Sequence, residues 1–271
     1  MSRKRITIHD LQEAKRNKIQ LAETFTMCPM EAAACEAAGI DIIVTMGPAT
    51  KGSQAKAIRE AAPNVFLVMA DDIRDPNIAN ESQAISAAFR LMEAGADAVY
   101  TSLSCKIIAA MAREKIPVIG HVGYVPYNVS WFGKPRAVGK KGLEAYEIYE
   151  QTMAHEDAGA IGVEIEIVPA KVTAEIAKRT EILLVSMGAG TGGDVQYLFA
   201  CDMLGTNTGH IPRHAKVYAN LHKELERVQQ MRIDAFKAFK DDVTSGAYPE
   251  EKHLLSIKDE EYDLFLKQLS K

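Results

Sequence analysis

Two glutamates lie inside an otherwise apolar segment, IGVEIEIV (161–168), and they are the strongest candidates for chemistry in this sequence. Because side chains alternate along a strand with period 2, Glu164 and Glu166 face the same side. Burying a carboxylate is costly unless it is paired or functional, and burial raises its pKa towards neutrality, which suits a general base. Glu166 is nearer the strand end and is the predicted base, with a structural pair to a lysine or arginine as the alternative.

Acidic residues and a histidine follow two other apolar runs. Asp71 and Asp72 come directly after NVFLVMA, and His121 ends IPVIGHV. Barrel enzymes place their chemistry at the carboxyl ends of parallel strands, and Mg²⁺ binds through carboxylates and water. Asp71 comes first after its run and is the predicted inward-facing group, with helix N-capping as the alternative. His121 is either a site residue or a structural histidine.

A glycine-rich turn and a long loop are further candidates for binding. Gly188, Gly190 and Gly193 match G-x-G-x-x-G, but they lie late in the chain and no second βαβ half follows. We therefore interpret them as a barrel turn that binds phosphate or carboxylate, not a dinucleotide. The loop 123–142 holds the only tryptophan, Trp131. A loop of this length is typical of a lid or a binding loop, and subunit packing is the alternative.

Three Ala-rich helices end on a glycine, and a β-branched strand follows each at once. The segments are EAAGIDIIV (36–44), EAGADAVY (93–100) and EDAGAIGVEI (156–165). Glycine at this position supplies a left-handed helix C-cap. The glycines are 56 and 64 residues apart, and each interval fits two βα units of about 30 residues. This spacing predicts a (β/α)₈ barrel, with an open doubly wound sheet as the alternative.

The apolar runs between the predicted helices assign the strands. Most are nearly continuous in apolar residues, as parallel strands buried on both faces are. The predicted strands span 19–25, 40–46, 64–70, 97–102, 116–122, 161–168 and 181–187. A seventh helix is predicted around 193–201 and a weak eighth strand at 201–207. Extra C-terminal helices are predicted at 215–243 and 258–269, packed outside the barrel or at a subunit contact.

Length and composition favour one globular domain over residues 1–271, with a C-terminal helical extension at about 215–271. The net charge of −4 gives no reason to expect nucleic acid or an anionic membrane as partner. No apolar run is long enough to span a bilayer. The basic N-terminus has no signal-peptide pattern, and the four cysteines show no CxxC pair and no zinc spacing. A cytoplasmic protein is expected.

Several collinear segments together resemble ketopantoate hydroxymethyltransferase, also called 3-methyl-2-oxobutanoate hydroxymethyltransferase. The resemblance covers residues from about 20 to 253. Its pieces are PVIGHVGYVPYNVSWFG (117–133), VEIEIVPAKVTAEIAKRT (163–180), MGAGTGGDVQ (187–196), TGHIPRHAK (208–216) and SGAYPEEKH (245–253).

The resemblance implies a barrel of the phosphoenolpyruvate/pyruvate type and a role in pantothenate biosynthesis. Family members bind Mg²⁺ and a 2-oxo acid, add a hydroxymethyl group taken from methylene-tetrahydrofolate, and form homo-oligomers. By this similarity Asp71 is a metal-site aspartate, His121 a substrate-contacting histidine and Glu166 the catalytic base.

The sequence departs from the family pattern at three strand ends. Gly47 and Pro48 stand where the family has an aspartate ligand and a substrate-binding serine. Tyr100-Thr101-Ser102 replaces a Lys-x-Glu, and Met27-Cys28 replaces a Tyr-Asp.

Two metal-site carboxylates and the substrate lysine are therefore absent. We expect Asp71, with Asp72 and water, to hold Mg²⁺, and Gly47, Tyr100 and Ser102 to line the substrate site. Two alternatives to the family reaction stay open. One is a C–C lyase or transferase of another 2-oxo acid on the same barrel, and the other is a catalytically silent assembly protein.

Overall fold

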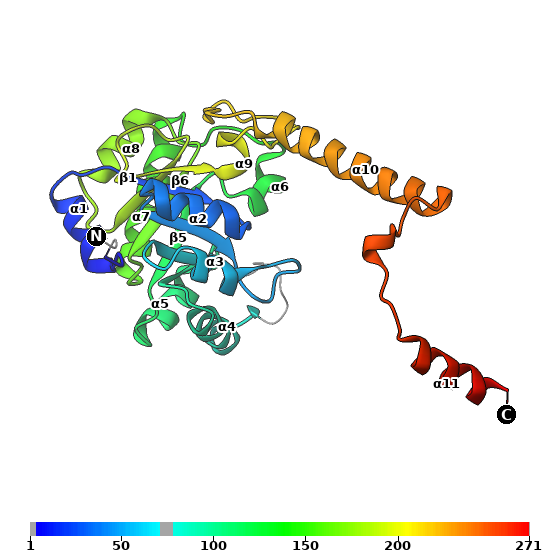
Figure 1. Cartoon of the computed structure of the whole chain (residues 1–271). Coiled ribbons are helices and arrows are strands. Elements are labelled where there is room, and N and C mark those ends of the chain that lie inside the picture. Colours follow the sequence, from blue (N-terminus) through cyan, green and yellow to red (C-terminus); the bar gives the residue numbers. More distant parts are fainter. Residues whose placement is uncertain (1–3, 71–77, 271) are drawn as a thin grey trace. The chain divides into compact units, whose positions relative to one another are not determined.

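The structure is a computed structural model that describes residues 4–70 and 78–270 (Figure 1). Eight parallel strands close into a barrel in which each strand pairs with the next and β8 pairs with β1. The predicted (β/α)₈ barrel is confirmed. The strands are β1 (Leu21–Phe25), β2 (Ile42–Met46), β3 (Phe66–Ala70), β4 (Ala98–Tyr100), β5 (Val118–Gly123), β6 (Gly162–Glu166), β7 (Leu183–Met187) and β8 (Val195–Phe199).

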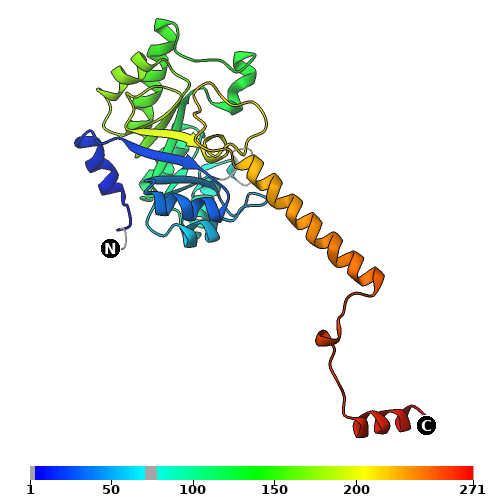
Figure 2. The same cartoon turned by 45° about the horizontal axis from the view of Figure 1, so that its top comes forward.

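Helices follow the strands and surround the barrel (Figures 1 and 2). The predicted glycine C-caps are present, because Gly39, Gly95 and Gly159 all have positive φ. The helices of residues 4–219 are α1 (Ile8–Arg16), α2 (Pro29–Ala38), α3 (Ala55–Ala61), α4 (Glu81–Glu93), α5 (Cys105–Arg113), α6 (Val129–Phe132), α7 (Gly142–Asp157), α8 (Ala170–Ala177) and α9 (Ala200–Met203), and η2 (Pro126–Asn128) is a 3₁₀ turn.

Alternation along the strands produces two separate cores. Ile42, Phe66 and Leu183 point into the barrel and pack with Leu11 of α1. Their neighbours in the chain, such as Ile43 and Leu67, pack between the strands and the surrounding helices. Both layers are almost fully buried, which is why these strands read as continuous apolar runs in the sequence.

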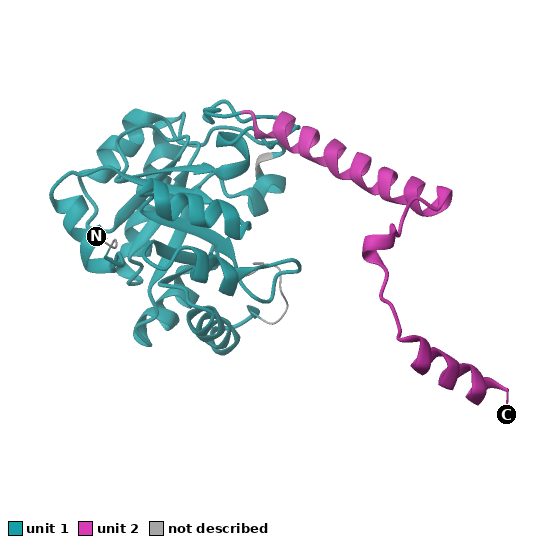
Figure 3. Ribbon diagram, viewed as in Figure 1, with its two compact units in different colours: residues 1–219 teal, residues 220–271 magenta. Residues whose placement is uncertain are grey.

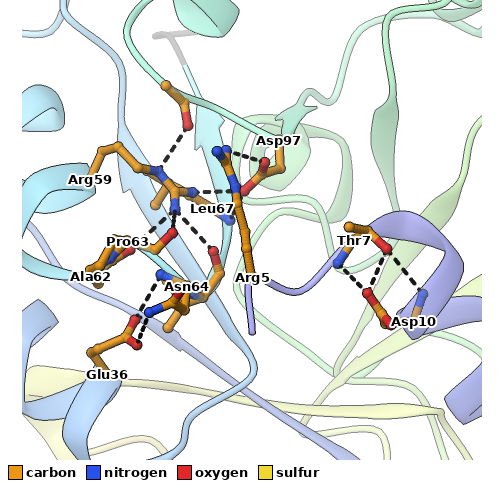
Figure 4. A network of polar contacts seen from close by, with 12 residues as sticks. Arg5, Thr7, Asp10, Glu36, Arg59, Ala62, Pro63, Asn64, Leu67 and Asp97 are labelled. Atoms are coloured by element: carbon orange, nitrogen blue, oxygen red, sulfur yellow. Dashed lines mark hydrogen bonds and ion pairs between the residues drawn. The ribbon is translucent and has the colours of Figure 1, made fainter. Parts of the chain in front are cut away.

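A polar network fastens the N-terminal ends of β3 and β4 (Figure 4). The Asp97 carboxylate accepts hydrogen bonds from Arg5 (2.6 Å) and Arg59 (2.7 Å). It also accepts the backbone N–H of Leu67 at 2.9 Å. The Glu36 carboxylate binds the side chain and backbone N–H of Asn64. These contacts lie at the end of the barrel that carries stability, opposite the end where barrel chemistry occurs.

The prediction for the last strand and helix of the barrel is wrong. β8 occupies Val195–Phe199, inside the predicted helix, and the start of the predicted strand at 201 belongs to α9. A short turn links β7 directly to β8, so the βα rhythm of about 30 residues is broken here. In VQYLF, Val195 and Tyr197 face inward and are buried, which satisfies a strand of period 2.

Residues 220–271 form a second unit, which is described separately from residues 1–219 (Figure 3). It contains α10 (Leu221–Ser245), the 3₁₀ turn η3 (Glu251–His253) and α11 (Asp259–Leu269). The extra C-terminal helices are thus confirmed, with α10 beginning and ending a few residues later than predicted. Within the described chain, no helix has the length and apolar character that crossing a membrane requires.

Candidate active site

A cavity of about 230 Å³ opens at the C-terminal ends of the strands. All eight strands contribute to its wall, as expected of a barrel active site. The lining residues used below are Phe25, Met46, Ala70, Tyr100, Ser102, His121, Glu164, Glu166, Met187, Tyr197 and Phe199. Most of this surface is apolar or aromatic, and the titratable groups gather on one side.

Strands β5 and β6 place three titratable side chains together. Their register pairs His121 with Glu164 and Gly123 with Glu166. The Nε2 atom of His121 lies 3.1 Å from Oε2 of Glu166 and 3.9 Å from Oε1 of Glu164. At 3.1 Å the two groups would form an ion pair only with a protonated histidine. The two side chains are not oriented for a hydrogen bond, and Nε2 of His121 therefore has no hydrogen-bond partner among the described residues.

Tyr100 at the end of β4 contacts the other side of the histidine ring. Its hydroxyl lies 2.5 Å from Nδ1 of His121, and the hydroxyl of Ser102 lies 3.4 Å from the same atom. The Tyr100 contact fixes the orientation of the ring. Predicted substrate-lining residues Tyr100 and Ser102 therefore lie on the cavity wall beside His121.

Burial controls the protonation of this cluster. It raises the pKa of Glu166 to about 8 and, as the largest cause, raises the pKa of Glu164. Burial also lowers the pKa of His121. A carboxyl group with a pKa near neutrality beside a neutral imidazole can accept a proton from a weak carbon acid.

A third buried carboxyl group, Glu23 on β1, was not singled out from the sequence. It is 5% exposed, and its Oε2 atom has no hydrogen-bond partner among the described residues. Burial first, and then the charge of Glu164, raise the pKa of Glu23 well above its usual value. The signal was present, because Glu23 interrupts the apolar run IQLAETF just as Glu164 interrupts its own strand.

Of the predicted site residues Gly47, Asp71 and Asp72, the structure describes only Gly47. Gly47 is buried and donates its backbone N–H to the carbonyl of Ala70 at 2.6 Å. It is absent from the described residues that line the cavity, although its neighbour Met46 is among them. The predicted metal ligands Asp71 and Asp72 lie outside the described residues. Ala70, the residue before them, lines the cavity.

The described residues at the ends of β2 and β4 do not fit the Mg²⁺ site that the resemblance implies. They offer Gly47 and the hydroxyl of Ser102, where Mg²⁺ requires carboxylate oxygens. No lysine or arginine occurs among the described cavity-lining residues that would bind a substrate carboxylate. The described lining of the cavity therefore holds a histidine and two glutamates on β5 and β6, and it offers no lysine, arginine or carboxylate at the ends of β2 and β4.

The loop after β5 contributes to the cavity through Pro126 and Tyr127. It contains η2 and α6, and its tryptophan, Trp131, is 86% exposed. The glycine turn lies elsewhere: Gly188 and Gly190 line a separate cavity of about 420 Å³. Its interpretation as an anion-binding turn stays a prediction.

The sequence model of the ketopantoate hydroxymethyltransferase family matches residues 50–251. The chain is 29% identical to 3-methyl-2-oxobutanoate hydroxymethyltransferase 1 of Methylibium petroleiphilum, over 99% of this chain and 95% of that protein. It is 32% identical to 3-methyl-2-oxobutanoate hydroxymethyltransferase of Corynebacterium efficiens, over 92% of this chain and 96% of that protein.

Two solved structures show the same fold. One is phosphonopyruvate hydrolase in complex with oxalate and Mg²⁺, with a TM-score of 0.51, 15% identity, and 98% and 97% of the two chains covered. The other is 2,3-dimethylmalate lyase, a member of the PEP mutase/isocitrate lyase superfamily, with a TM-score of 0.51, 13% identity and 92% of each chain covered. Both structures share the (β/α)₈ barrel fold with this chain. The family match over residues 50–251 and the two hydroxymethyltransferase relatives show that the chain belongs to the ketopantoate hydroxymethyltransferase family, which is a family of enzymes.

Proposed function

We propose that this protein adds a hydroxymethyl group to C3 of a 2-oxo acid of the size of 3-methyl-2-oxobutanoate. The one-carbon donor in this proposal is methylene-tetrahydrofolate, and the product serves pantothenate biosynthesis. The observation that carries the proposal is the buried Glu166 carboxyl group, which faces the cavity with a pKa raised to about 8. The names of the relatives support the choice of substrate.

In this reaction Glu166 takes the proton from C3 of the 2-oxo acid, and the resulting enolate carbon forms a bond to the one-carbon unit. The two C–N bonds of that unit to tetrahydrofolate break, water supplies the hydroxyl oxygen, and the protons from C3 and from water end on the nitrogens of the released tetrahydrofolate. His121 stays neutral because burial lowers its pKa, and Tyr100 holds its ring in place. The apolar part of the wall, including Phe25 and Phe199, suits a branched aliphatic side chain and excludes water from the enolate.

Mg²⁺ stays a prediction in this proposal, with Asp71 and Asp72 as its ligands. When bound to a 2-oxo acid, Mg²⁺ makes the C3 proton more acidic. The roles of Glu166, His121 and Tyr100 depend only on this chain's own residues.

A homo-oligomeric, cytoplasmic protein is also part of the proposal. Within residues 220–271, large apolar side chains of α10, such as Phe236 and Phe239, are exposed, and a subunit contact would bury them. Light scattering after size-exclusion chromatography measures the mass directly, and a monomeric mass would contradict this part.

Deuterium exchange at C3 tests the base. We expect the protein to exchange the C3 proton of 3-methyl-2-oxobutanoate in D₂O, as followed by proton NMR. Glu166→Gln lowers the rate at least about 100-fold, because general base catalysis contributes 10²–10⁴-fold. The control is Glu175→Gln, which changes an exposed glutamate on α8.

A wild-type exchange rate in Glu166→Gln rules out Glu166 as the base. Exchange of another 2-oxo acid, with none of 3-methyl-2-oxobutanoate, assigns the chain to a divergent lyase or transferase. A lack of exchange with every 2-oxo acid tested favours the silent assembly protein.

A further inference from the structure

The cluster on β5 and β6 has the composition of a metal site. His121, Glu164 and Glu166 each offer one donor atom, and these atoms all lie within 4.8 Å of one another. All three side chains are buried, with side-chain exposures of 3%, 4% and 10%. Adjacent strands in fixed register hold them, so their spacing comes from rigid elements.

The unpaired histidine nitrogen points to a missing partner. His121 Nε2 is buried and has no hydrogen-bond partner among the described residues, although Glu166 Oε2 is only 3.1 Å away. A buried polar atom without a partner carries a free-energy cost. A metal ion between the nitrogen and the two carboxylates would use the lone pair that no hydrogen bond uses.

The second ring nitrogen already has the contact that a metal-bound histidine needs. Metal-ligating histidines usually donate their other N–H to an oxygen, which fixes the tautomer. The Tyr100 hydroxyl lies 2.5 Å from Nδ1, and its oxygen can accept a hydrogen bond from the Nδ1–H group. This arrangement leaves Nε2 unprotonated and directed towards the glutamates.

Charge balance favours a cation at the same place. Glu23, Glu164 and Glu166 are all buried in the barrel. The described lining of the cavity includes no lysine or arginine to pair with them. Buried carboxylates are strongly unfavourable unless they are paired or coordinate a metal, and one divalent cation would neutralise two of them.

We propose that His121, Glu164 and Glu166 bind one divalent transition-metal ion, with Zn²⁺ preferred over Mg²⁺. One imidazole and two carboxylates suit Zn²⁺ or a similar ion, whereas Mg²⁺ favours oxygen ligands alone. This site is on the β5–β6 wall, whereas the resemblance assigns the family metal to positions that follow β2 and β3 in the sequence. A carboxylate has two oxygens, so Glu166 can bind the ion through one and accept a proton on the other.

Titration of the metal-free full-length protein tests this site without any substrate, so the result is independent of the proposed reaction. By calorimetry we expect one Zn²⁺ per chain and much weaker binding of Mg²⁺. His121→Gln and Glu164→Gln each weaken Zn²⁺ binding at least about 10-fold, the lower bound for changes around a metal site. Glu164→Gln keeps the proposed base Glu166.

Glu175→Gln is the control, because Glu175 is an exposed glutamate on α8 outside the cluster. We expect it to leave the Zn²⁺ dissociation constant within about twofold, as for independent sites. Bound Zn²⁺ also raises the melting temperature of the wild type, and Glu164→Gln removes that rise.

A crystal grown with Zn²⁺ requires no variant and covers the case in which the substitutions impair folding. We expect an anomalous peak about 2.0–2.2 Å from His121 Nε2. The proposal is overturned if the wild type binds no stoichiometric Zn²⁺, if Glu164→Gln binds it as tightly as the wild type, or if the peak lies only at surface histidines.

Discussion

The two sides of the barrel mouth offer a substrate different chemistry. The β5–β6 side carries a histidine and two glutamates, all buried and within 4.8 Å of one another. The described residues at the ends of β2, β3 and β4 are instead Met46, Ala70 and the hydroxyl-bearing segment Tyr100–Ser102. The β5–β6 side can therefore transfer a proton. The described residues at the ends of β2, β3 and β4 contribute apolar surface and hydroxyl groups instead.

In the proposed function, this difference assigns the proton transfer to the β5–β6 side. The residues that resemble the family base and its histidine remain, at Glu166 and His121. The positions that resemble its substrate lysine and two of its metal carboxylates hold other residues. Glu164 lies beside Glu166 on β6, and Glu23 is a further buried glutamate on β1. A reaction centre of this kind depends first on the contact between β5 and β6.

Breaking the β5–β6 contact gives the largest expected effect. Gly123 has a φ of +83°, and a Cβ at this position would lie 2.5 Å from the carbonyl oxygen of Glu166. We expect Gly123→Ala to destabilise the protein by about 3 kcal/mol, because both the backbone conformation and a close contact oppose the new methyl group. Chemical denaturation measures the loss.

The matched control for this change is Gly133→Ala. Gly133 also has a positive φ, +75°, but a Cβ there would meet nothing within 4 Å. The difference between the two variants isolates the contact from the strain. Equal losses would mean that the strands are not packed as closely as the account requires.

The contact between Tyr100 and His121 joins the two sides of the barrel mouth, and its removal tests whether the sides act together. Tyr100 belongs to β4 and contacts His121 on β5. We expect Tyr100→Phe to lower the C3 exchange rate about 10-fold, the usual effect of about one lost hydrogen bond. Tyr146→Phe, on the exposed face of α7, is the control. An unchanged exchange rate in Tyr100→Phe would mean that proton transfer on the β5–β6 side does not depend on the Tyr100 hydroxyl.

Replacing the ionisable carboxyl group of Glu23 gives the smallest expected effect, a change in stability that depends on pH. Because the pKa of Glu23 is raised in the folded protein, the folded state holds a proton that the unfolded chain releases at neutral pH. Stability therefore falls as pH rises above the ordinary pKa of a glutamate. We expect Glu23→Gln to raise the melting temperature by about 2–4 °C at neutral to alkaline pH. A gain that does not shrink as the pH falls to about 5 contradicts this linkage.

The sequence predicted seven strands because each is a continuous apolar run, and glycine marks three of the preceding helix ends. It failed at β8, where VQYLF is only half-buried and a short turn replaces the expected helix. Glu166 and His121 were found because strand ends face the barrel mouth. Their spacing was out of reach, since it depends on the β5–β6 register, which no local pattern encodes.

A crystal structure with 3-methyl-2-oxobutanoate bound tests most directly whether the β5–β6 side is the reacting side. We expect C3 of the ligand to lie about 3–3.5 Å from the Glu166 carboxylate, the distance of a reactive encounter, with its isopropyl group against the aromatic wall. A ligand whose C3 faces β2 and β4, out of reach of Glu166, would contradict it.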